Sequence, residues 1–419
     1  MMLNYDLVCF AHLRWDFVYQ RPQHLLSRAV QERRIFYVEE PIFVGTTATL
    51  ELREDKSGVM IATPHLPHGL NTERQEILTQ DLVGQLFERC KIDNYVVWVY
   101  SPIFMPLVRQ LKPRATVYDC MDELSNFLFA PPVLREREQE LFKAADVVFT
   151  GGVSLWEAKQ SQHPNVHAFP SSVDVPHFMQ ARKSLEQPQD MVEIPHPRVG
   201  FYGVIDERMD LELLEGVADT LPDVHFVIVG PVVKVDPAHL PQRGNIHYLG
   251  QKSYAELPAY LAHWDAAMMP FALNDSTRFI SPTKTPEFLA AGKPTISTRI
   301  RDVVRPYGEM GLVWIADDVQ GFADAVMQAL TQDYTERGQR ADRFVGAMSW
   351  DLTWRRMEDQ ISASMARKSR ALIGLPHRKG TPKLEDPRQP QNEVQTPVQN
   401  PVRPQFGRSS GVPGAASGD

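Results

Sequence analysis

Cysteine, basic charge and long apolar runs are all scarce in this sequence. The three cysteines, Cys9, Cys90 and Cys120, show no CxxC spacing, which argues against a disulfide framework and a structural zinc site and favours a reducing cytosol. The net charge of -8 predicts no general surface for nucleic acid. The first residues lack a basic segment followed by an apolar run, and no later segment approaches a membrane-spanning helix. We therefore expect a cytoplasmic protein.

Two further motifs are missing. The histidines form no HxxxH or HExxH pair on a convincing helical pattern, so metal chemistry has no support and we expect no metal site. No GxGxxG follows a predicted strand, which argues against an NAD-dependent dehydrogenase.

Short β-rich runs alternate with longer amphipathic segments along most of the chain, a pattern typical of parallel sheets built from βαβ units. In the first half we predict strands at residues 6–10, 34–40, 59–64, 95–100, 115–119 and 146–150. In the second half we predict them at residues 198–203, 224–230, 245–250, 265–271, 293–298 and 311–316. The fold class is α/β, with two doubly wound Rossmann-like domains facing a cleft.

The boundaries follow from loss of periodicity and from composition. We predict a first domain at 1–182, a linker at 183–198 that carries three prolines, and a second domain at 199–348. A helix at 349–370 packs back across the boundary, and the Pro-, Gln-, Gly- and Ser-rich residues 376–419 form a disordered tail. Because ligands bind at the carboxyl ends of strands in open α/β sheets, residues that follow strands are the site candidates.

The stretch SPTKTPEFLAAGKP, residues 281–294, reads as one short helix that follows a predicted strand. Either Ser281 caps this helix with Pro282 in the first position, or Thr285 caps it with Pro286 first. In both cases the amino end of the helix points at the cleft.

Polar groups gather at this helix mouth. Free backbone N–H groups favour an anion, the hydroxyls of Ser281, Thr283 and Thr285 add donors, and Lys284 supplies a full charge for a phosphate. Glu287 suits two vicinal hydroxyls, such as those of a ribose. Together they fit a nucleoside diphosphate; the alternative is an ordinary surface helix with an ion pair between positions 284 and 287.

The second domain starts with GFYGVIDERMD, a strand followed by a loop. Gly200 and Gly203 stand where such a loop approaches a phosphate, although two glycines alone are a weak signal. Arg208 would make a bidentate contact with a diphosphate. Its alternative is a surface ion pair with Asp206, Glu207 or Asp210.

The first domain offers acids and a histidine after two of its strands. HLRWDFVYQRPQHL places His12 and Asp16 in the cleft, and VYDCMDELSNF places Asp119, Asp122 and Glu123 at the end of another strand. Three carboxylates within five residues would repel one another and raise one pKa toward that of a general base. A helix-capping role for one of them is the alternative.

Several of these stretches resemble one family. SPTKTPEFLAAGKPTIST resembles the donor-binding signature of GT-B glycosyltransferases of the group-1 (family 4-like) superfamily, in which P-x-K-x-x-E-hydrophobic-L-A-x-G-K-P holds a nucleotide sugar. The stretches HLRWDFVYQRPQHLLSR, VYDCMDELSNF, GFYGVIDERMDLELL and SWDLTWRRM resemble a bacterial branch associated with cell-surface polysaccharide assembly. The similarity covers roughly residues 6 to 365.

The resemblance implies a metal-independent hexosyltransferase without a cofactor, which transfers a sugar from a nucleoside diphosphate donor, UDP-linked, to a hydroxyl of a glycan or lipid-linked acceptor. The donor is held mainly by the second domain and the acceptor by the first. Contact with the inner membrane surface is expected and nucleic acid is not. Lys284, Arg208 and the amides after Ser281 would bind diphosphate, and Glu287 the ribose.

Glycosyl transfer also requires a base that takes the proton of the acceptor hydroxyl. Asp122 is our first candidate, with Asp119 and Asp16 close behind, and His12 also qualifies.

This sequence departs from the family pattern in two places. Phe279 stands eight positions before Glu287, where many of these enzymes carry a second glutamate, and Pro286 replaces a more usual aliphatic residue. Retention or inversion of anomeric configuration is therefore open. A sugar-nucleotide epimerase and a catalytically inactive GT-B scaffold that binds a partner are the alternative functions.

Overall fold

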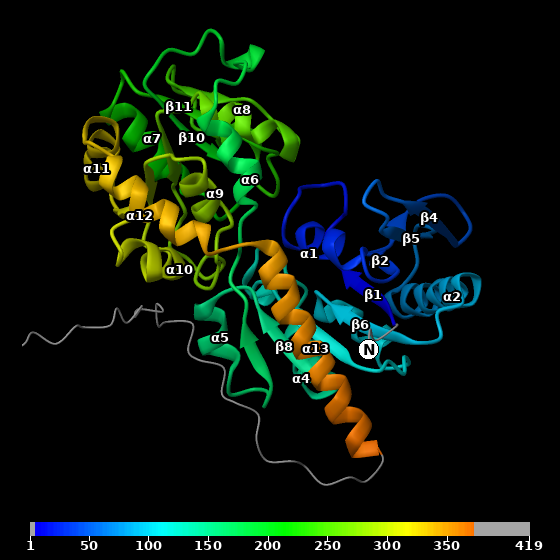
Figure 1. Cartoon of the computed structure of the whole chain (residues 1–419). Helices are drawn as coiled ribbons and strands as arrows, with labels where there is room; N and C mark the ends of the chain where they lie inside the picture. Colours follow the sequence, from blue (N-terminus) through cyan, green and yellow to red (C-terminus); the bar gives the residue numbers. More distant parts are fainter. Residues whose placement is uncertain (1–4, 373–419) are drawn as a thin grey trace, which may run out of the picture. The chain divides into compact units, whose positions relative to one another are not determined.

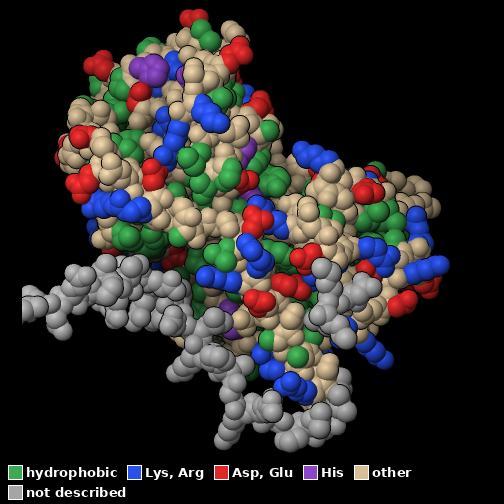
Figure 2. All heavy atoms as spheres, viewed as in Figure 1, with side chains coloured by type: hydrophobic (Ala, Val, Ile, Leu, Met, Phe, Trp, Pro, Cys, Tyr) green, Lys and Arg blue, Asp and Glu red, His purple; other side chains and the backbone are tan. Residues whose placement is uncertain are grey.

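The computed structural model describes residues 5–372, and the tail predicted at 376–419 lies outside the described residues. Within the described part the chain builds two parallel β-sheets with helices on both faces (Figure 1), so the predicted α/β class is confirmed. Lysine, arginine, aspartate and glutamate side chains are interspersed on the face shown in Figure 2.

The first sheet has the strand order β3-β5-β2-β1-β6-β7-β8-β9, with β4 antiparallel to β5 at one edge. Its strands are β1 (Asp6–Ala11), β2 (Ile35–Glu39), β3 (Ile42–Phe43), β4 (Thr49–Glu54), β5 (Met60–Leu66), β6 (Tyr95–Val99), β7 (Thr116–Cys120), β8 (Val147–Thr150) and β9 (Val166–Ala168). The six strands predicted for this half are present. Strands β3, β4 and β9 were missed because they are short or largely exposed and lack an apolar run.

Both faces of the first sheet are buried. Leu7 and Cys9 of β1 belong to one apolar cluster, and Val8 and Phe10 of the same strand belong to another. Successive side chains of a strand point to opposite faces, so a continuous apolar run is what a doubly covered parallel strand requires. The helices of this part are α1 (Arg21–Ala29), α2 (Thr72–Cys90), α3 (Met105–Val108), α4 (Leu134–Ala144) and α5 (Val153–Lys159).

The second sheet is wholly parallel, with the order β12-β11-β10-β13-β14-β15. Its strands, all six of them predicted, are β10 (Arg198–Tyr202), β11 (His225–Val229), β12 (Ile246–Tyr248), β13 (Ala266–Met269), β14 (Thr295–Ser297) and β15 (Trp314–Ile315). Its helices are α7 (Leu211–Thr220), α8 (Leu257–Ala262), α9 (Lys284–Ala290), α10 (Arg301–Val303), α11 (Val319–Thr331) and α12 (Thr335–Gly346). Gly200 packs against the indole of Trp264, where a Cβ would collide with the ring, so this glycine serves packing.

Two segments connect the two sheets. Helix α6 (Val175–Phe178) follows β9 and already contributes Phe178 to the core of the second sheet, so the chain enters that core before the linker predicted at 183–198. Helix α13 (Trp350–Leu372) covers the stretch predicted at 349–370 and packs against α1 (Figure 1). Its Glu358 accepts hydrogen bonds of 2.9 to 3.1 Å from Tyr5 and Arg33. No helix in residues 5–372 is long and apolar enough to cross a membrane.

Candidate functional site

A cavity of about 100 Å³ lies between the two sheets, at the carboxyl ends of their strands. We call it the interdomain pocket. Its first-domain residues are Gln20, Arg21, Met121, Asp122, Gly151 and Ser171. Its second-domain residues are Val204, Arg208, Phe271, Ile280, Ser281, Pro282, Thr283 and Lys284. The fold therefore brings together five predicted site residues: Asp122, Arg208, Ser281, Thr283 and Lys284.

Lys284 brings a buried ammonium to this pocket, near the carboxylates of Glu287, Asp206 and Asp122. Among residues 5–372 its ammonium makes no hydrogen bond or ion pair, and it lies 5.6 Å from the ring centroid of Phe201 and 6.0 Å from that of Phe271. Burial and the nearby Arg208 guanidinium lower the pKa of Lys284 to about 8. Such a partly desolvated cation is ready to bind an anion.

Gly203 makes room for this lysine. Its φ is +146°, and a Cβ at this position would collide with Cε of Lys284. We predicted Gly203 as a residue that approaches phosphate; its direct neighbour in the structure is the lysine side chain.

Arg208 is oriented by a carboxylate and still faces the pocket. Its Nε donates to Oδ1 of Asp206 at 2.9 Å and its Nη2 to Oδ2 at 2.7 Å. The surface-pair alternative is thus partly correct, although Asp206 is only 5% exposed. Nη1 of Arg208 makes no hydrogen bond within residues 5–372 and stays available to a ligand.

The start of α9 differs from both alternatives that we predicted. The helix begins at Lys284, and Thr283 in the N-cap position has a helical backbone and no side-chain cap. Thr285 cannot cap because it is fully buried, with its hydroxyl directed at the sulfur of Met269. The carbonyl of Ser281 accepts a hydrogen bond of 2.8 Å from Ser171 of the first domain. A ligand at this place would therefore meet side chains rather than a capped helix end.

Glu287 lies behind the pocket rather than in its wall. It is 4% exposed, and its Oε2 accepts a hydrogen bond of 2.6 Å from the hydroxyl of Tyr202. Burial raises the pKa of Glu287 to about 7, against the lowering effect of the Tyr202 hydrogen bond. Its Oε1 makes no hydrogen bond in the described part of the chain. The ribose contact of Glu287 stays a prediction.

Asp122 is the acid of the first domain that lines the interdomain pocket. Burial raises the pKa of Asp122 to about 6, while nearby guanidinium and ammonium groups oppose this shift. The shift has the predicted direction but a different cause. Glu123 forms an ion pair with Lys159 at 2.7 Å, and Asp119 forms one with Arg21 at 2.9 Å. Repulsion from these two carboxylates is therefore not what raises the pKa of Asp122.

Asp119 is inaccessible, which corrects its assignment as a candidate base. Its carboxylate is fully buried and accepts from Nε of Arg21 at 3.0 Å and from Nη2 at 2.9 Å. Arg21 also donates to the carbonyl of Phe169 at 2.7 Å. Asp119 therefore positions Arg21 at the pocket wall. The two residues are 98 positions apart, and no local pattern announces their contact.

Asp16 and His12, like Asp119, are predicted first-domain residues that do not line the interdomain pocket. The side chain of Asp16 is 68% exposed and paired with Arg53 beside another cavity, because Arg14 holds this segment toward β2 by binding Glu39. Nδ1 of His12 is shielded from water without a hydrogen bond among the described residues. Burial, with a smaller effect of Lys234, lowers the pKa of His12 to about 4, so the imidazole is neutral at pH 7.

Our sequence analysis missed Gly151 as a pocket residue. A Cβ at this position would collide with the carbonyl of Met121, so glycine lets the ends of β7 and β8 approach. The pair Gly151 and Gly152 directly after a predicted strand was an available signal. Within residues 5–372, no group of three or more histidine, cysteine, aspartate or glutamate side chains could hold a metal ion.

The two domains contact each other around the pocket. The backbone N–H of Leu128 donates to Glu207 at 3.0 Å, and Tyr19 stacks on Tyr254 with ring centroids 4.4 Å apart. A pocket of about 100 Å³ is smaller than the ~300 to 1,000 Å³ of typical small-molecule sites. Entry of a nucleotide-sized ligand therefore requires the domains to separate and these contacts to break.

The sequence matches a family model and a known relative. Residues 196–332 match the family model described as glycosyl transferases group 1. A protein of Bacillus subtilis (strain 168), TuaH, whose name assigns it to teichuronic acid biosynthesis as a glycosyltransferase, is 25% identical over 233 residues. The match covers 51% of this chain, and it spans only about half of the relative's own length, 56%.

Solved structures resemble the chain over most of its length. The sucrose-phosphate synthase of Thermosynechococcus elongatus has a TM-score of 0.65 at 13% identity, covering 87% of this chain and 100% of its own. An Escherichia coli structure described as trehalose-6-phosphate bound with UDP-2-fluoro glucose has a TM-score of 0.64 at 11% identity, covering 86% and 99%. The catalytic domain of starch synthase IV from Arabidopsis thaliana, bound to ADP and acarbose, has a TM-score of 0.61 at 10% identity, covering 87% and 100%. At these identities the likeness shows the fold alone.

Proposed function

We propose that this chain transfers a sugar from a nucleoside diphosphate donor to a hydroxyl of a glycan or lipid-linked acceptor. The proposal is supported by residues 196–332, which match the group 1 glycosyltransferases, and by the GT-B fold. The observation that carries the proposal lies in the interdomain pocket, where the ammonium of Lys284 and Nη1 of Arg208 both lack a hydrogen-bond partner among the described residues. Two cations that converge on one small cavity suit a diphosphate. UDP is our proposed nucleotide, supported by a similarly folded structure that holds a UDP-sugar analogue.

In the proposed mechanism, the acceptor oxygen forms a bond to the anomeric carbon while the bond from that carbon to the diphosphate breaks. Lys284 and Arg208 neutralise the charge that develops on the departing nucleoside diphosphate, and we propose that they do so without a metal ion. Asp122, on the opposite wall of the pocket, takes the proton of the acceptor hydroxyl. Domain closure excludes water, so that the acceptor rather than water attacks.

The first experiment is calorimetric titration of the purified protein with UDP, GDP and ADP, with and without EDTA. Tight UDP binding that survives EDTA supports the proposal, and a screen of UDP-sugars with glycan acceptors then tests transfer. If no nucleotide binds, the function proposed here is wrong. Product analysis without any acceptor separates transfer from epimerisation, because an epimerase needs no acceptor.

Glu287→Ala is expected to weaken UDP binding by at least about tenfold, since a hydrogen bond to a charged group contributes ~1.5 to 3 kcal/mol. The open Oε1 and the Tyr202 contact support a role for Glu287 in holding the ribose. Titration calorimetry measures the effect, and Glu336→Ala, an exposed change on α12, is the control. Unchanged affinity in Glu287→Ala would remove the ribose assignment.

Asp122→Asn is expected to suppress turnover by about 100-fold or more while UDP affinity changes less than in Glu287→Ala. Because the base must be ionised and burial raises the pKa of Asp122 to about 6, wild-type turnover should fall as the pH drops below about 6. A steady-state pH profile with a saturating donor measures this. Full turnover of the variant at pH 7 would assign the base to another residue.

The acceptor is proposed to be lipid-linked, as we expect for cell-surface polysaccharide assembly; the name of the TuaH relative assigns that protein to teichuronic acid biosynthesis. This would bring the first domain to the inner membrane surface. Cosedimentation with vesicles that contain anionic lipid is the expected result, and failure to sediment with vesicles of any composition would exclude peripheral binding.

A further inference from the structure

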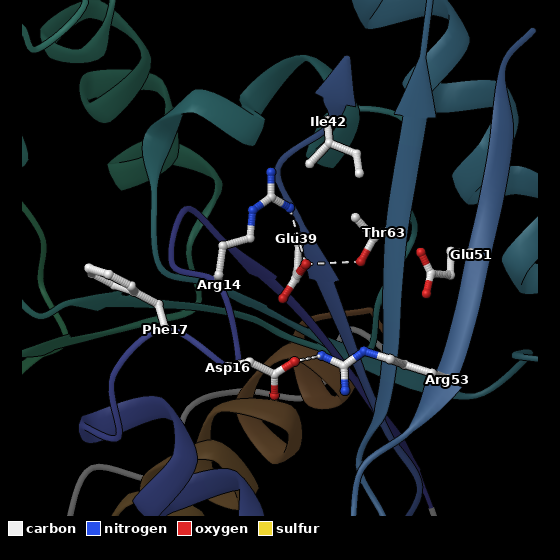
Figure 3. Close-up of a pocket in the computed structure, with 8 residues that line it drawn as sticks. All are labelled: Arg14, Asp16, Phe17, Glu39, Ile42, Glu51, Arg53 and Thr63. Atoms are coloured by element: carbon white, nitrogen blue, oxygen red, sulfur yellow. Dashed lines mark hydrogen bonds and ion pairs between the residues drawn. The ribbon is translucent and has the colours of Figure 1, made fainter. Parts of the chain in front are cut away.

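The first domain contains a second cavity, of about 450 Å³, which the proposed chemistry does not use. We call it the distal pocket, and Figure 3 shows the residues that line it: Arg14, Asp16, Phe17, Glu39, Ile42, Glu51, Arg53 and Thr63. We propose that the distal pocket binds one or two rings of a neutral or amino sugar and discriminates against acidic sugars. This inference rests on the proposed function, because it assigns a place and a chemical class to a glycan substrate.

Five segments build this cavity, among them β3 through Ile42. The loop after β1 supplies Arg14, Asp16 and Phe17, and the end of β2 supplies Glu39. On β4, alternation puts Glu51 and Arg53 on one face, and the antiparallel register places Glu51 opposite Thr63 of β5. The charged side chains of β4 thus face the same space as the loop, which no local pattern in the sequence indicates.

The floor of the distal pocket is held rigidly. Glu39 is 4% exposed and accepts hydrogen bonds from Arg14 Nη1 at 3.1 Å, from Thr63 Oγ1 at 2.9 Å and from the backbone N–H of Trp15 at 2.8 Å. Arg14 donates further to the carbonyl of Glu40 at 2.6 Å. A saturated buried carboxylate of this kind preorganises the surface on which a ligand would lie.

The rim carries charged groups with free hydrogen-bonding capacity. Arg53 and Asp16 form an ion pair (Figure 3), and their side chains are 36% and 68% exposed. Glu51 contacts Nε2 of His65 at 2.9 Å and is 52% exposed. Oδ1 of Asp16, Oε1 of Glu51 and two nitrogens of Arg53 make no hydrogen bond in residues 5–372. They would accept from and donate to sugar hydroxyls.

The balance of charge selects the ligand class. The pocket holds the carboxylates of Asp16, Glu39 and Glu51 against the guanidinium groups of Arg14 and Arg53. A uronate or phosphate would meet this excess of negative charge and would compete for guanidinium groups that are already paired. The hydroxyl of a neutral sugar carries no charge, and it can donate to a carboxylate and accept from a guanidinium. The ammonium of an amino sugar is in addition attracted by the excess of carboxylates.

Size and position also fit a glycan. About 450 Å³ lies within the ~300 to 1,000 Å³ of small-molecule sites, and Ile42 adds apolar wall for the C–H face of a ring. The loop that ends at Phe17 continues into Gln20 and Arg21 of the interdomain pocket. Gln251 of the second domain donates to the carbonyl of Phe17 at 2.5 Å. A glycan in the distal pocket would therefore contact the segment that leads to the proposed reaction centre.

The test is calorimetric titration of the full chain, without nucleotide, with methyl glucoside, maltose, glucosamine and glucuronate. The neutral sugars and glucosamine are expected to bind with millimolar Kd, and glucuronate at least about tenfold more weakly. Arg53→Gln and Asp16→Asn should each weaken maltose binding by about fivefold or more, because each removes free donors or acceptors from an exposed position. Glu54→Gln, on the same strand but the other face, should change nothing. Glu51→Arg should admit glucuronate.

Two results would overturn the inference. One is glucuronate binding as tight as that of maltose; the other is no sugar binding by a protein that still binds UDP through Lys284. The second result leaves the proposed function intact. Conversely, sugar binding with the predicted variant pattern in a protein that binds no nucleotide would support the distal pocket and refute the proposed function, so the two failures are distinguishable.

Discussion

Replacing Lys284 with alanine is expected to weaken UDP binding by about 10- to 100-fold, because it removes a charge-assisted contact of ~1.5 to 3 kcal/mol to the diphosphate. Within residues 5–372 the ammonium of Lys284 makes no hydrogen bond or ion pair that a ligand would first have to break, although nearby carboxylates attract it. Burial lowers the pKa of Lys284 to about 8. The amine becomes neutral above this value, so wild-type affinity should fall as the pH rises beyond about 8, and the variant should lose this dependence. Titration calorimetry between pH 6.5 and about 9.5 measures both effects.

A matched control is available in the same domain. Burial also lowers the pKa of Lys293 to about 8, but its ammonium donates to the carbonyls of Ala262 and Trp264. Lys293→Ala should keep both UDP affinity and its pH dependence. Gly203→Ala, which would displace the Lys284 side chain, should weaken binding as Lys284→Ala does. Wild-type affinity in Lys284→Ala would contradict the diphosphate assignment.

Arg21→Ala is expected to lower the free energy of unfolding by about 3 to 5 kcal/mol, because the fully buried carboxylate of Asp119 loses its partner. For a domain of this size the melting temperature should fall by about 10 °C. Asp119→Ala should destabilise to a similar extent. Chemical and thermal denaturation followed by circular dichroism measures the loss.

The control for this prediction is Arg109→Ala. Arg109 pairs with Glu140 at the surface, with 54% of its side chain exposed, and such pairs contribute less than ~1 kcal/mol. Asp119→Asn separates a positioning role from a catalytic one. If Asp119→Asn abolishes turnover but leaves the free energy of unfolding unchanged, Asp119 is the base after all. From the structure we expect instead that this variant loses stability.

Much of the fold could be predicted from the sequence because its signals are local. All twelve predicted strands are present, since a doubly covered parallel strand such as β6 must be apolar on both faces. The run around Lys284 could also be singled out from the sequence, because a few neighbouring residues carry the whole pattern; its role in donor binding stays a prediction. Strand β4 was missed because its charged residues, among them Glu51 and Arg53, alternate on an exposed edge and resemble a loop.

The roles of the acidic residues could not be predicted in the same way. Asp119, Asp122 and Asp16 look alike as residues that follow strands, yet the structure buries the first in an ion pair, turns the second into the interdomain pocket and places the third on the distal pocket. Their environments depend on Arg21 and Arg53, which are distant in the sequence, and on the loop path that Arg14 sets.

By itself, the sequence determined the α/β class, the positions of twelve strands and the run that carries Lys284 and Glu287, because periodicity and short motifs act between near neighbours. Within residues 5–372, the tertiary structure decided that Lys284 makes no ion pair, that Glu287 is held by Tyr202, and that Asp122 alone among the predicted carboxylates lines the interdomain pocket. Desolvation and ion pairing set these properties. Both depend on which distant side chains the two sheets bring into contact, and on how much water the fold excludes around them.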